Sequence, residues 1–261
     1  MSNLYIVGTP IGNMEDISLR ALRILSEVDF ILCEDTRVTS KLLTRYRIKT
    51  PTISYHQHSK TDKTDYILGL LESGKSLALV SDAGTPGISD PGGKLVQAVT
   101  EKFGNDIKIE SVPGPSAVTA ALSISGIPTD KFVFLGFLPH KKGRQTFLKK
   151  IIDSEFPVVV YESKHRILKF LGELEKTQDE WNKEVELQNK EQGARNPGRA
   201  PRSGAGKKQK KKKVNISSVV VCRELSKMHE TVYRGELKDI AGKIKDSKGD
   251  QKGEFVVIIG K

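Results

Sequence analysis

Short apolar runs that alternate with helical segments constrain the fold of this 261-residue chain more than any other feature. The runs rich in Val, Ile, Leu and Phe are residues 4–7, 30–33, 77–80, 107–112, 132–135, 158–161, 219–222 and 255–259. Turns rich in Gly, Pro, Asp or Ser follow them. Between the runs, apolar residues return at helical spacing, as in Leu19, Leu22, Leu25 and Val28. This alternation predicts βα units, a largely parallel sheet and an α/β fold class.

Pro113, Gly114 and Pro115 mark the best domain boundary, because two prolines that flank a glycine stop any helix and fix a bend. We therefore expect an N-terminal α/β domain over residues 1–114 and a C-terminal α/β domain over residues 115–261. The second domain is interrupted by a stretch at about 177–214 that reads as a flexible basic insert.

The positive charge is concentrated in one segment. The formal net charge is +11, and nine basic residues with no acidic one stand between Arg195 and Lys213. The acid-rich stretch before it, residues 173–191, reads as a solvated helix that frays into the loop. The Lys-rich segment is either a solubilising loop or an electrostatic arm for polyanions. A second basic patch around Lys141, Lys142 and Arg144 is either an ordinary helix face or part of an RNA-binding surface.

Two cysteines, Cys33 and Cys222, stand in apolar runs and are expected in the core of a protein from a reducing compartment. The N-terminus has no basic stretch followed by an apolar one, so no signal peptide is predicted. No apolar run approaches the roughly 20 residues of a membrane span. The expected location is the cytoplasm, without membrane association.

Three loops rich in glycine and proline follow predicted strands, at residues 8–13, 81–92 and 113–117. In open α/β sheets ligands bind beyond the carboxyl ends of strands, and glycines let the backbone approach them closely. Any one loop alone could be a tight turn. Residues 8–13 do not match the G-x-G-x-x-G dinucleotide fingerprint, and Leu95 stands where a P-loop needs Ser or Thr. His56 and His58 lack a third metal ligand at a diagnostic spacing.

Taken together and in this order, these loops make the chain closely resemble the ribosomal RNA small subunit methyltransferase I family, a branch of the tetrapyrrole methylase superfamily. The resemblance covers nearly the whole chain outside residues 177–214. The matching segments are residues 5–13, 33–37, 54–58, 80–92, 112–117, 136–139, 161–163 with 165–166, 222–227 and 253–257.

The resemblance implies an S-adenosyl-L-methionine-dependent enzyme that methylates the ribose 2′-hydroxyl of a cytidine in the decoding region of 16S rRNA. It also implies two α/β domains of the tetrapyrrole methylase type with the cofactor in the cleft between them, action on the small ribosomal subunit, and a homodimer. By carry-over, the residues that contact the cofactor are Pro10, Gly12, Asp82, Ala83, Gly84, Thr85, Ser116 and Ala117.

The chain departs from the family pattern in four places. Lys164 stands where the motif has proline, and His140 stands where it has arginine. The insert before Val219 replaces a short turn, and the sequence stops at Lys261 where many members continue into a small further domain. These departures bear on RNA docking more than on the cofactor, and we expect the Lys-rich arm to add RNA affinity.

Methyl transfer to a ribose hydroxyl needs alignment of the reacting atoms and a group that accepts the hydroxyl proton. Candidates at strand ends are Glu34, Asp35, Glu162, His165 and Glu224. Asp35 and Glu162 are preferred, because each lies just past a strand beside a basic residue. An ion pair with a neighbouring arginine is the alternative for each. The hypothesis is that Asp35→Asn or Glu162→Gln abolishes transfer while cofactor binding survives.

Arginines near these carboxylates are expected to hold the phosphates that flank the target nucleotide, since a planar guanidinium suits bidentate contacts. Arg37 and His165 complete the predicted catalytic set with Asp35 and Glu162. The predicted RNA-binding residues are Arg37, Lys141, Lys142, Arg144, Arg166 and Arg223.

Two other functions stay open at this point. A tetrapyrrole methylase that acts on a corrin-type small molecule would share the cofactor loops. A non-catalytic ribosome-assembly protein that binds RNA could retain the fold without turnover, and it would fail to bind the cofactor.

Overall fold

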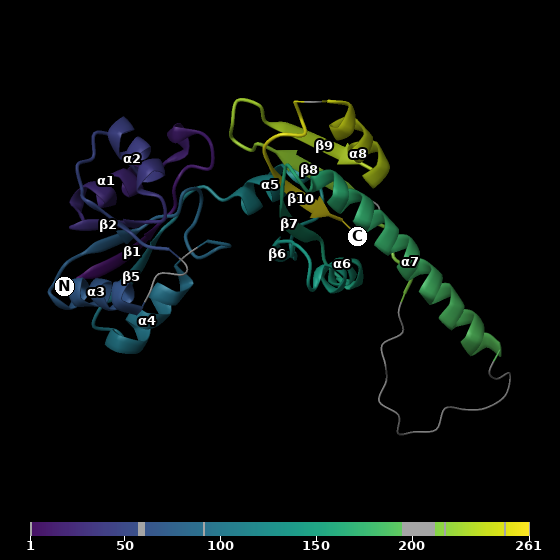
Figure 1. Cartoon of the computed structure of the whole chain (residues 1–261), viewed down its shortest axis with the longest axis horizontal. Coiled ribbons are helices and arrows are strands. Elements are labelled where there is room, and N and C mark those ends of the chain that lie inside the picture. The colour runs from purple at the N-terminus through teal and green to yellow at the C-terminus, as the bar shows by residue number, and fades with distance from the viewer. Residues whose placement is uncertain are drawn as a thin grey trace, which may run out of the picture. The chain divides into compact units, whose positions relative to one another are not determined.

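The computed structural model describes residues 2–56, 61–90, 92–194, 212–216, 218–247 and 249–260. The chain divides into two compact units (Figure 1). Unit 1 comprises Met1–Ala120 with Leu225–Met228, and unit 2 comprises Ala121–Glu224 with His229–Lys261. The change of unit falls within helix α5 (Ala117–Ser125), just after the bend at residues 113–115.

Unit 1 contains a parallel five-stranded sheet in the order β3-β2-β4-β1-β5, as the alternation of strands and helices predicted. Four of its strands lie within a residue of the predicted runs. The short strand β3 was not predicted, because its three residues carry only one apolar side chain. The strands are β1 (Asn3–Val7), β2 (Phe30–Cys33), β3 (Thr52–Ser54), β4 (Leu77–Leu79) and β5 (Lys108–Val112).

Helices cover both faces of this sheet (Figure 1). The first pair, α1 and α2, packs with Val7 and Ile31 on one face, while α3 and α4 pack with Leu4 and Leu32 on the other. Alternating side chains of one strand therefore serve two separate cores. The helices are η1 (Met14–Asp16), α1 (Leu19–Glu27), α2 (Thr36–Arg45), α3 (Thr61–Glu72) and α4 (Gly93–Phe103).

Unit 2 contains a mixed sheet in the order β6-β7-β10-β8-β9, which corrects the expectation of largely parallel strands. Only β6 and β7 pair in parallel. The last strand inserts antiparallel between β7 and β8, and a short connection turns β8 back into β9. The strands are β6 (Val133–Phe137), β7 (Val158–Ser163), β8 (Val219–Arg223), β9 (Thr231–Gly235) and β10 (Glu254–Ile259).

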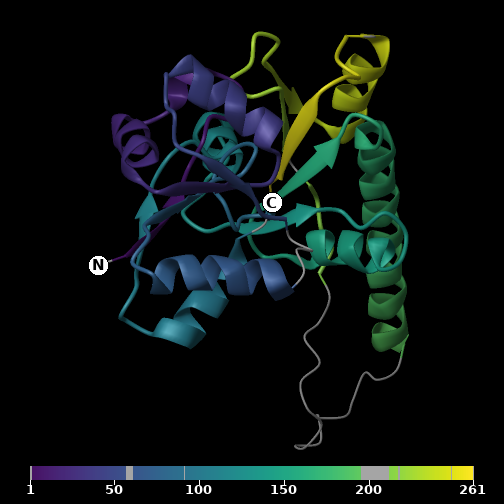
Figure 2. The same ribbon diagram turned by 60° about the vertical axis from the view of Figure 1, so that its left-hand side comes forward.

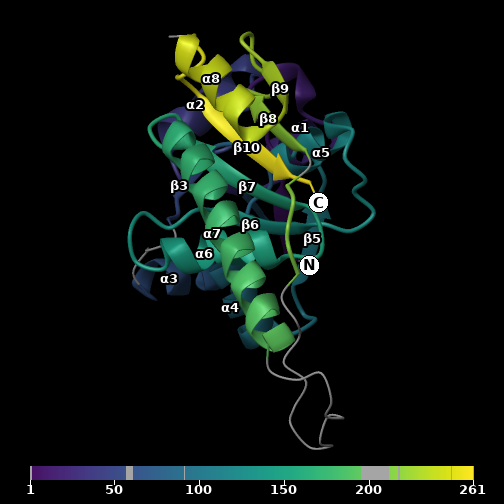
Figure 3. The same ribbon diagram turned by 90° about the vertical axis from the view of Figure 1, so that its right-hand side faces the viewer.

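Three helices, α6 (Arg144–Asp153), α7 (Ile167–Ala194) and α8 (Leu237–Asp246), cover one face of this sheet (Figure 3). Figure 2 shows how far α7, drawn in green, runs along unit 2. The helix confirms the helix predicted over residues 173–191, and it corrects the flexible insert predicted to begin at about 177. Trp181 and Val185 are buried, because they extend the apolar stripe of the helix by whole turns.

Residues 212–214, at the end of the predicted insert, are attached to α7. The Trp181 indole donates to the Lys212 carbonyl at 3.1 Å, and Asn182 exchanges two hydrogen bonds with the Val214 backbone at 2.8 and 2.9 Å. Lys213 pairs with Glu186 at 2.6 Å. The rest of the predicted Lys-rich arm, residues 195–211, lies outside the described residues.

Cys33 and Cys222 are both buried and free, as predicted for core residues. Burial raises the pKa of the Cys33 thiol and raises that of Cys222 to about 11. Within the described part of the chain, none of the helices combines the length and the apolar character that a membrane crossing requires.

Candidate functional site

The three glycine loops meet at the carboxyl edge of the unit 1 sheet, because they follow the adjacent strands β4, β1 and β5. Thr9 and Gly84 exchange backbone hydrogen bonds at 2.9 and 3.1 Å. The Gly8 amide donates to the Val112 carbonyl at 3.0 Å, and the Thr85 hydroxyl donates to the Pro115 carbonyl at 3.5 Å. The loops therefore form one connected backbone surface.

Two glycines make this contact between loops sterically feasible. A Cβ on Gly8 would lie 2.8 Å from the Gly114 Cα, and a Cβ on Gly114 would lie 2.8 Å from the Gly8 carbonyl oxygen. Gly84 has φ +81°, a conformation that side chains disfavour. Only glycine lets these backbones approach so closely.

The predicted cofactor residues all lie on this connected surface. Gly12, Asp82 and Ala83 are exposed, and Gly84 is buried. The partly exposed members are Pro10, Thr85, Ser116 and Ala117. A surface made of backbone groups and small side chains fits an adenosyl group, which proteins commonly hold through such contacts.

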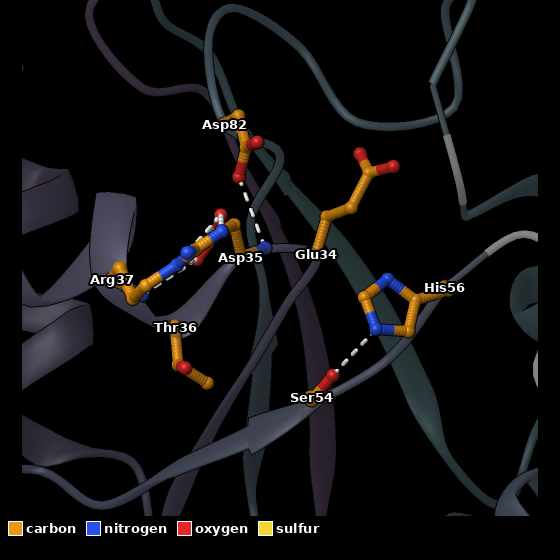
Figure 4. A pocket seen from close by; sticks show the side chains of 7 residues that line it. All are labelled: Glu34, Asp35, Thr36, Arg37, Ser54, His56 and Asp82. Atoms are coloured by element: carbon orange, nitrogen blue, oxygen red, sulfur yellow. Dashed lines mark hydrogen bonds and ion pairs between the residues drawn. The ribbon is translucent and has the colours of Figure 1, made fainter.

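A pocket of about 400 Å³ opens at the same edge (Figure 4). The chain leaves β2 toward β3 through α2 on one face, and it leaves β4 toward β5 through α4 on the other face. The pocket therefore lies at a topological switch point, where open α/β sheets bind ligands. The seven residues that line this switch-point pocket are Glu34, Asp35, Thr36, Arg37, Ser54, His56 and Asp82.

Asp82 belongs to both features. It stands in the glycine loop after β4 and also lines the switch-point pocket, where its carboxylate accepts from the Asp35 amide at 3.1 Å. Across the pocket, the Ser54 hydroxyl and the His56 Nε2 atom lie 2.9 Å apart. Gln57, His58 and Pro91 of the family segments lie outside the described residues. A ligand on the glycine loops would consequently border whatever occupies the pocket.

Asp35 caps helix α2 and pairs with Arg37. Its carboxylate accepts from the Arg37 backbone amide at 2.8 Å and from the guanidinium at 2.7 Å (Figure 4). These contacts, the Arg37 side chain first, lower the pKa of Asp35 to about 2. A carboxylate with so low a pKa is a weak proton acceptor at neutral pH. This geometry favours Asp35 as the residue that orients Arg37, whose side chain is 87% exposed.

Asp90 is the titratable group that the sequence reasoning missed. It is partly buried on the loop after β4. Burial, followed by the negative charge of Glu34, raises the pKa of Asp90 to about 6. The sequence places Asp90 in a family segment, but its neighbours Glu34 and Asp82 come from the loops after β2 and β4, which only the fold brings together.

Glu162 lies at the end of β7 with its side chain fully buried. It pairs with Arg166 at 2.8 Å and faces Arg144 at 3.9 Å. Arg144 also pairs with Glu173 at 2.6 Å. We call Arg144, Glu162, Arg166 and Glu173 the Glu162 network. Its burial between two guanidinium groups favours a structural role for Glu162 over a role in direct proton transfer.

The Glu162 network holds the loop that follows β6. Arg166 donates to the Leu138 carbonyl at 3.0 Å, and Arg144 donates to the Pro139 carbonyl at 3.1 Å. Arg144 and Arg166, two of the four arginines predicted to bind RNA, therefore bond inside the unit. Four side chains beside them are exposed instead: Lys141, Lys142, Lys164 and His165.

Arg223 is also directed inward. Its guanidinium donates to the carbonyls of Lys252, His229 and Gly249 at 2.7, 2.9 and 2.8 Å, and its residue is 6% exposed. Asp250 lies 3.3 Å from it. This arrangement favours a structural role for Arg223 rather than the predicted phosphate contact.

The comparisons with known proteins agree with this architecture. Residues 3–191 match the family described as Tetrapyrrole (Corrin/Porphyrin) Methylases. Ribosomal RNA small subunit methyltransferase I of Thermotoga maritima is 38% identical over 259 residues, 99% of this chain and 98% of that protein. The protein of the same name from Synechocystis sp. is 39% identical over 260 residues, 99% of this chain and 79% of that protein.

Solved structures share the fold at low identity. Diphthine synthase has a TM-score of 0.64 and 15% identity, with coverage of 100% of this chain and 90% of that one. Uroporphyrin-III-C-methyltransferase from Thermus thermophilus has a TM-score of 0.58 and 18% identity, with coverage of 100% and 95%. At such identities the similarity establishes the two-sheet α/β fold and nothing about the substrate.

Proposed function

Because the chain belongs to the ribosomal RNA small subunit methyltransferase I family of tetrapyrrole methylases, we propose that it methylates 16S rRNA with S-adenosylmethionine as donor. The proposed acceptor is the ribose 2′-hydroxyl of a cytidine in the decoding region. One observation carries the proposal: a protein named ribosomal RNA small subunit methyltransferase I is 38% identical to the chain over 99% of its length. The glycine loops and the adjoining pocket support it.

The residues proposed to hold the cofactor are those of the connected loop surface, from Pro10 and Gly12 through Asp82–Thr85 to Ser116 and Ala117. When bound, S-adenosylmethionine would supply a methyl group whose carbon an oxygen nucleophile attacks in one step, while the carbon–sulfur bond breaks and the neutral thioether S-adenosylhomocysteine leaves. Backbone hydrogen bonds between Thr9 and Gly84 connect these loops, and the absence of side chains on Gly8 and Gly114 lets them approach closely. Such preorganisation aligns reacting atoms, which is the main task in a displacement of this kind.

We assign the target nucleotide to the switch-point pocket, because Asp82 is shared by that pocket and the cofactor loops. Arg37 is the exposed cation at its rim, and Asp35 orients it through their ion pair. A guanidinium in this position suits a phosphate of the RNA backbone.

We assign proton acceptance to Asp90, whose carboxyl lies on the loop after β4 and interacts with Glu34 and Asp82, two residues that line the pocket. A ribose hydroxyl is a very weak acid, so its proton must pass to a base as the new carbon–oxygen bond forms. With a pKa of about 6, Asp90 is ionised at neutral pH and is a far stronger base than Asp35. The nearby charge of Glu34 sustains that basicity.

The function is tested by incubating unmodified small ribosomal subunits with the protein and methyl-labelled S-adenosylmethionine. The RNA is then hydrolysed with alkali, which cleaves wherever the 2′-hydroxyl is free. We expect label in an alkali-resistant dinucleotide with a 5′ cytidine, and mass spectrometry of RNA fragments locates it. Label in mononucleotides would contradict 2′-O-methylation. If the cofactor binds but no methyl group is transferred, a tetrapyrrole methylase that acts on a small molecule is favoured. If the cofactor does not bind, a non-catalytic RNA-binding protein is favoured.

A further inference from the structure

A bulge in the edge strand β6 gathers aromatic side chains on one face of unit 2. Phe134 pairs with Val159 and Phe137 pairs with Tyr161, so three steps along β6 match two along β7. Gly136, with φ +66°, accommodates the extra residue. Without the bulge, Phe134 and Phe137 would point to opposite faces of the strand.

The three rings form a contiguous aromatic surface. The Tyr161 ring centroid lies 5.0 Å from that of Phe134 and 5.3 Å from that of Phe137. Phe134 and Tyr161 are partly buried, but Phe137 is 54% exposed, more than Phe132 at 40% or Phe156 at 37%. One face of a firmly supported ring is therefore available to a ligand.

Exposed lysines lie on the two loops at the sheet edge that carries Phe137. Because β6 and β7 are parallel, the loops after them leave from the same edge of the sheet. The first carries Lys141 and Lys142, and the second carries Lys164. All three lysines are exposed, and none has a carboxylate partner among the residues that the structure describes.

The loop after β6 is held by the buried Arg144 and the partly buried Arg166. Arg144 and Arg166 bind its carbonyls at Pro139 and Leu138, and both guanidinium groups face the buried Glu162 carboxylate. The lysines consequently project from an ordered base. A preorganised surface loses less entropy when it binds.

We propose that Phe137 and the lysines of these two loops bind an unpaired nucleotide of the RNA substrate, with the base stacked on the ring and its phosphates on Lys141 and Lys142. The inference rests on the proposed function and adds a second RNA contact, in unit 2. Proteins hold single-stranded RNA through exposed aromatic rings that stack on bases together with cations that contact the backbone, whereas paired bases expose no π-face for stacking.

Binding of a fluorescein-labelled, unstructured oligoribonucleotide of cytidine and uridine to the full chain tests this proposal. Phe137→Ala should weaken it by roughly 5- to 150-fold, the range for loss of one stacked base, while Phe137→Trp should restore it. Phe156→Ala is the matched control, because Phe156 is a partly exposed phenylalanine just before β7, at the opposite end of that strand. We expect that control to bind like the unsubstituted protein.

Salt titration separates the two contacts. The double variant Lys141→Gln, Lys142→Gln should reduce the salt slope of binding by about 1.4, and Phe137→Ala should leave the slope unchanged. A fully paired RNA hairpin should be insensitive to Phe137→Ala. Three results with Phe137→Ala would overturn the proposal. The first is an unchanged affinity for single-stranded RNA, and the second is an equal loss of affinity for the hairpin. The third is a loss of S-adenosylmethionine binding in place of a loss of RNA binding. Failure of methyl transfer with this RNA binding intact would count against the proposed function alone.

Discussion

The strand-end carboxylates of unit 1 and unit 2 both pair with arginine, but the first pair is exposed to solvent and the second is largely buried. In unit 1, Asp35 is 26% exposed in its side chain and pairs locally with Arg37, which is 87% exposed. In unit 2, the Glu162 side chain is fully buried and faces arginines that are 7% and 17% exposed. Water screens the first pair and reaches little of the second.

The difference teaches that a carboxylate beside an arginine can serve two purposes. A solvated pair leaves both groups free to meet a ligand, and it contributes little to stability. A buried pair locks the elements that carry it, because removing one partner leaves an uncompensated charge in the protein interior. Unit 1 therefore keeps titratable groups at its pocket, while unit 2 uses its charges to hold a loop.

The largest expected effect is on stability. Glu162→Gln should lower the free energy of unfolding by about 3 kcal/mol, because the partly buried Arg166 loses its ion-pair partner and the buried Arg144 keeps only Glu173. Asp35→Asn should leave the unfolding midpoint unchanged, since asparagine caps a helix as well as aspartate does. Urea denaturation followed by circular dichroism measures both. A stable Glu162→Gln protein, or a destabilised Asp35→Asn protein, would remove the distinction between the two pairs.

The next effect is on catalysis. Asp90→Asn should reduce the methyl-transfer rate by roughly 10²- to 10⁴-fold, the usual contribution of a general base, with cofactor affinity unchanged. Asp35→Asn is the matched variant from the same edge of the sheet, and it should retain most of the rate. Single-turnover transfer to unmodified subunits measures both. The reverse order of the two rates would return the role of base to Asp35.

The fold of unit 1 was largely predictable, whereas the pairing of unit 2 was not. Runs such as residues 30–33 are continuously apolar and largely buried, so the sequence alone predicts where these strands begin and end. Strand β9 has only two apolar residues, Val232 and Tyr233, in its five positions. The pairing of β10 with β7 joins segments that are about 90 residues apart in the sequence, which no local pattern predicts. Helix α7 extends past the predicted start of the insert at 177 because Trp181 and Val185 reach the core.

The sequence predicted which residues belong to the candidate site, but it did not predict which of their side chains are buried or exposed. The glycine loops and the residues around Asp35 were identified from their order along the chain. The burial of Glu162, Arg144 and Arg223 depends on strands and helices distant in sequence, so their inward direction could not be predicted. The bulge at Gly136 likewise decides which face Phe137 occupies, and one inserted residue leaves no clear signal in the pattern.

The smallest expected effect is a shift in pH dependence. Transfer requires ionised Asp90, so the rate at low substrate should fall as the pH drops through about 6, the pKa of this carboxyl. Glu34→Gln removes a negative neighbour that raises that pKa, and the acid limb of the profile should move to lower pH. Asp35, with a pKa of about 2, titrates well below this range, so Asp35→Asn should leave the limb in place. A limb that moves in Asp35→Asn but not in Glu34→Gln would show that the pair with Arg37, rather than the partly buried Asp90, titrates during the reaction.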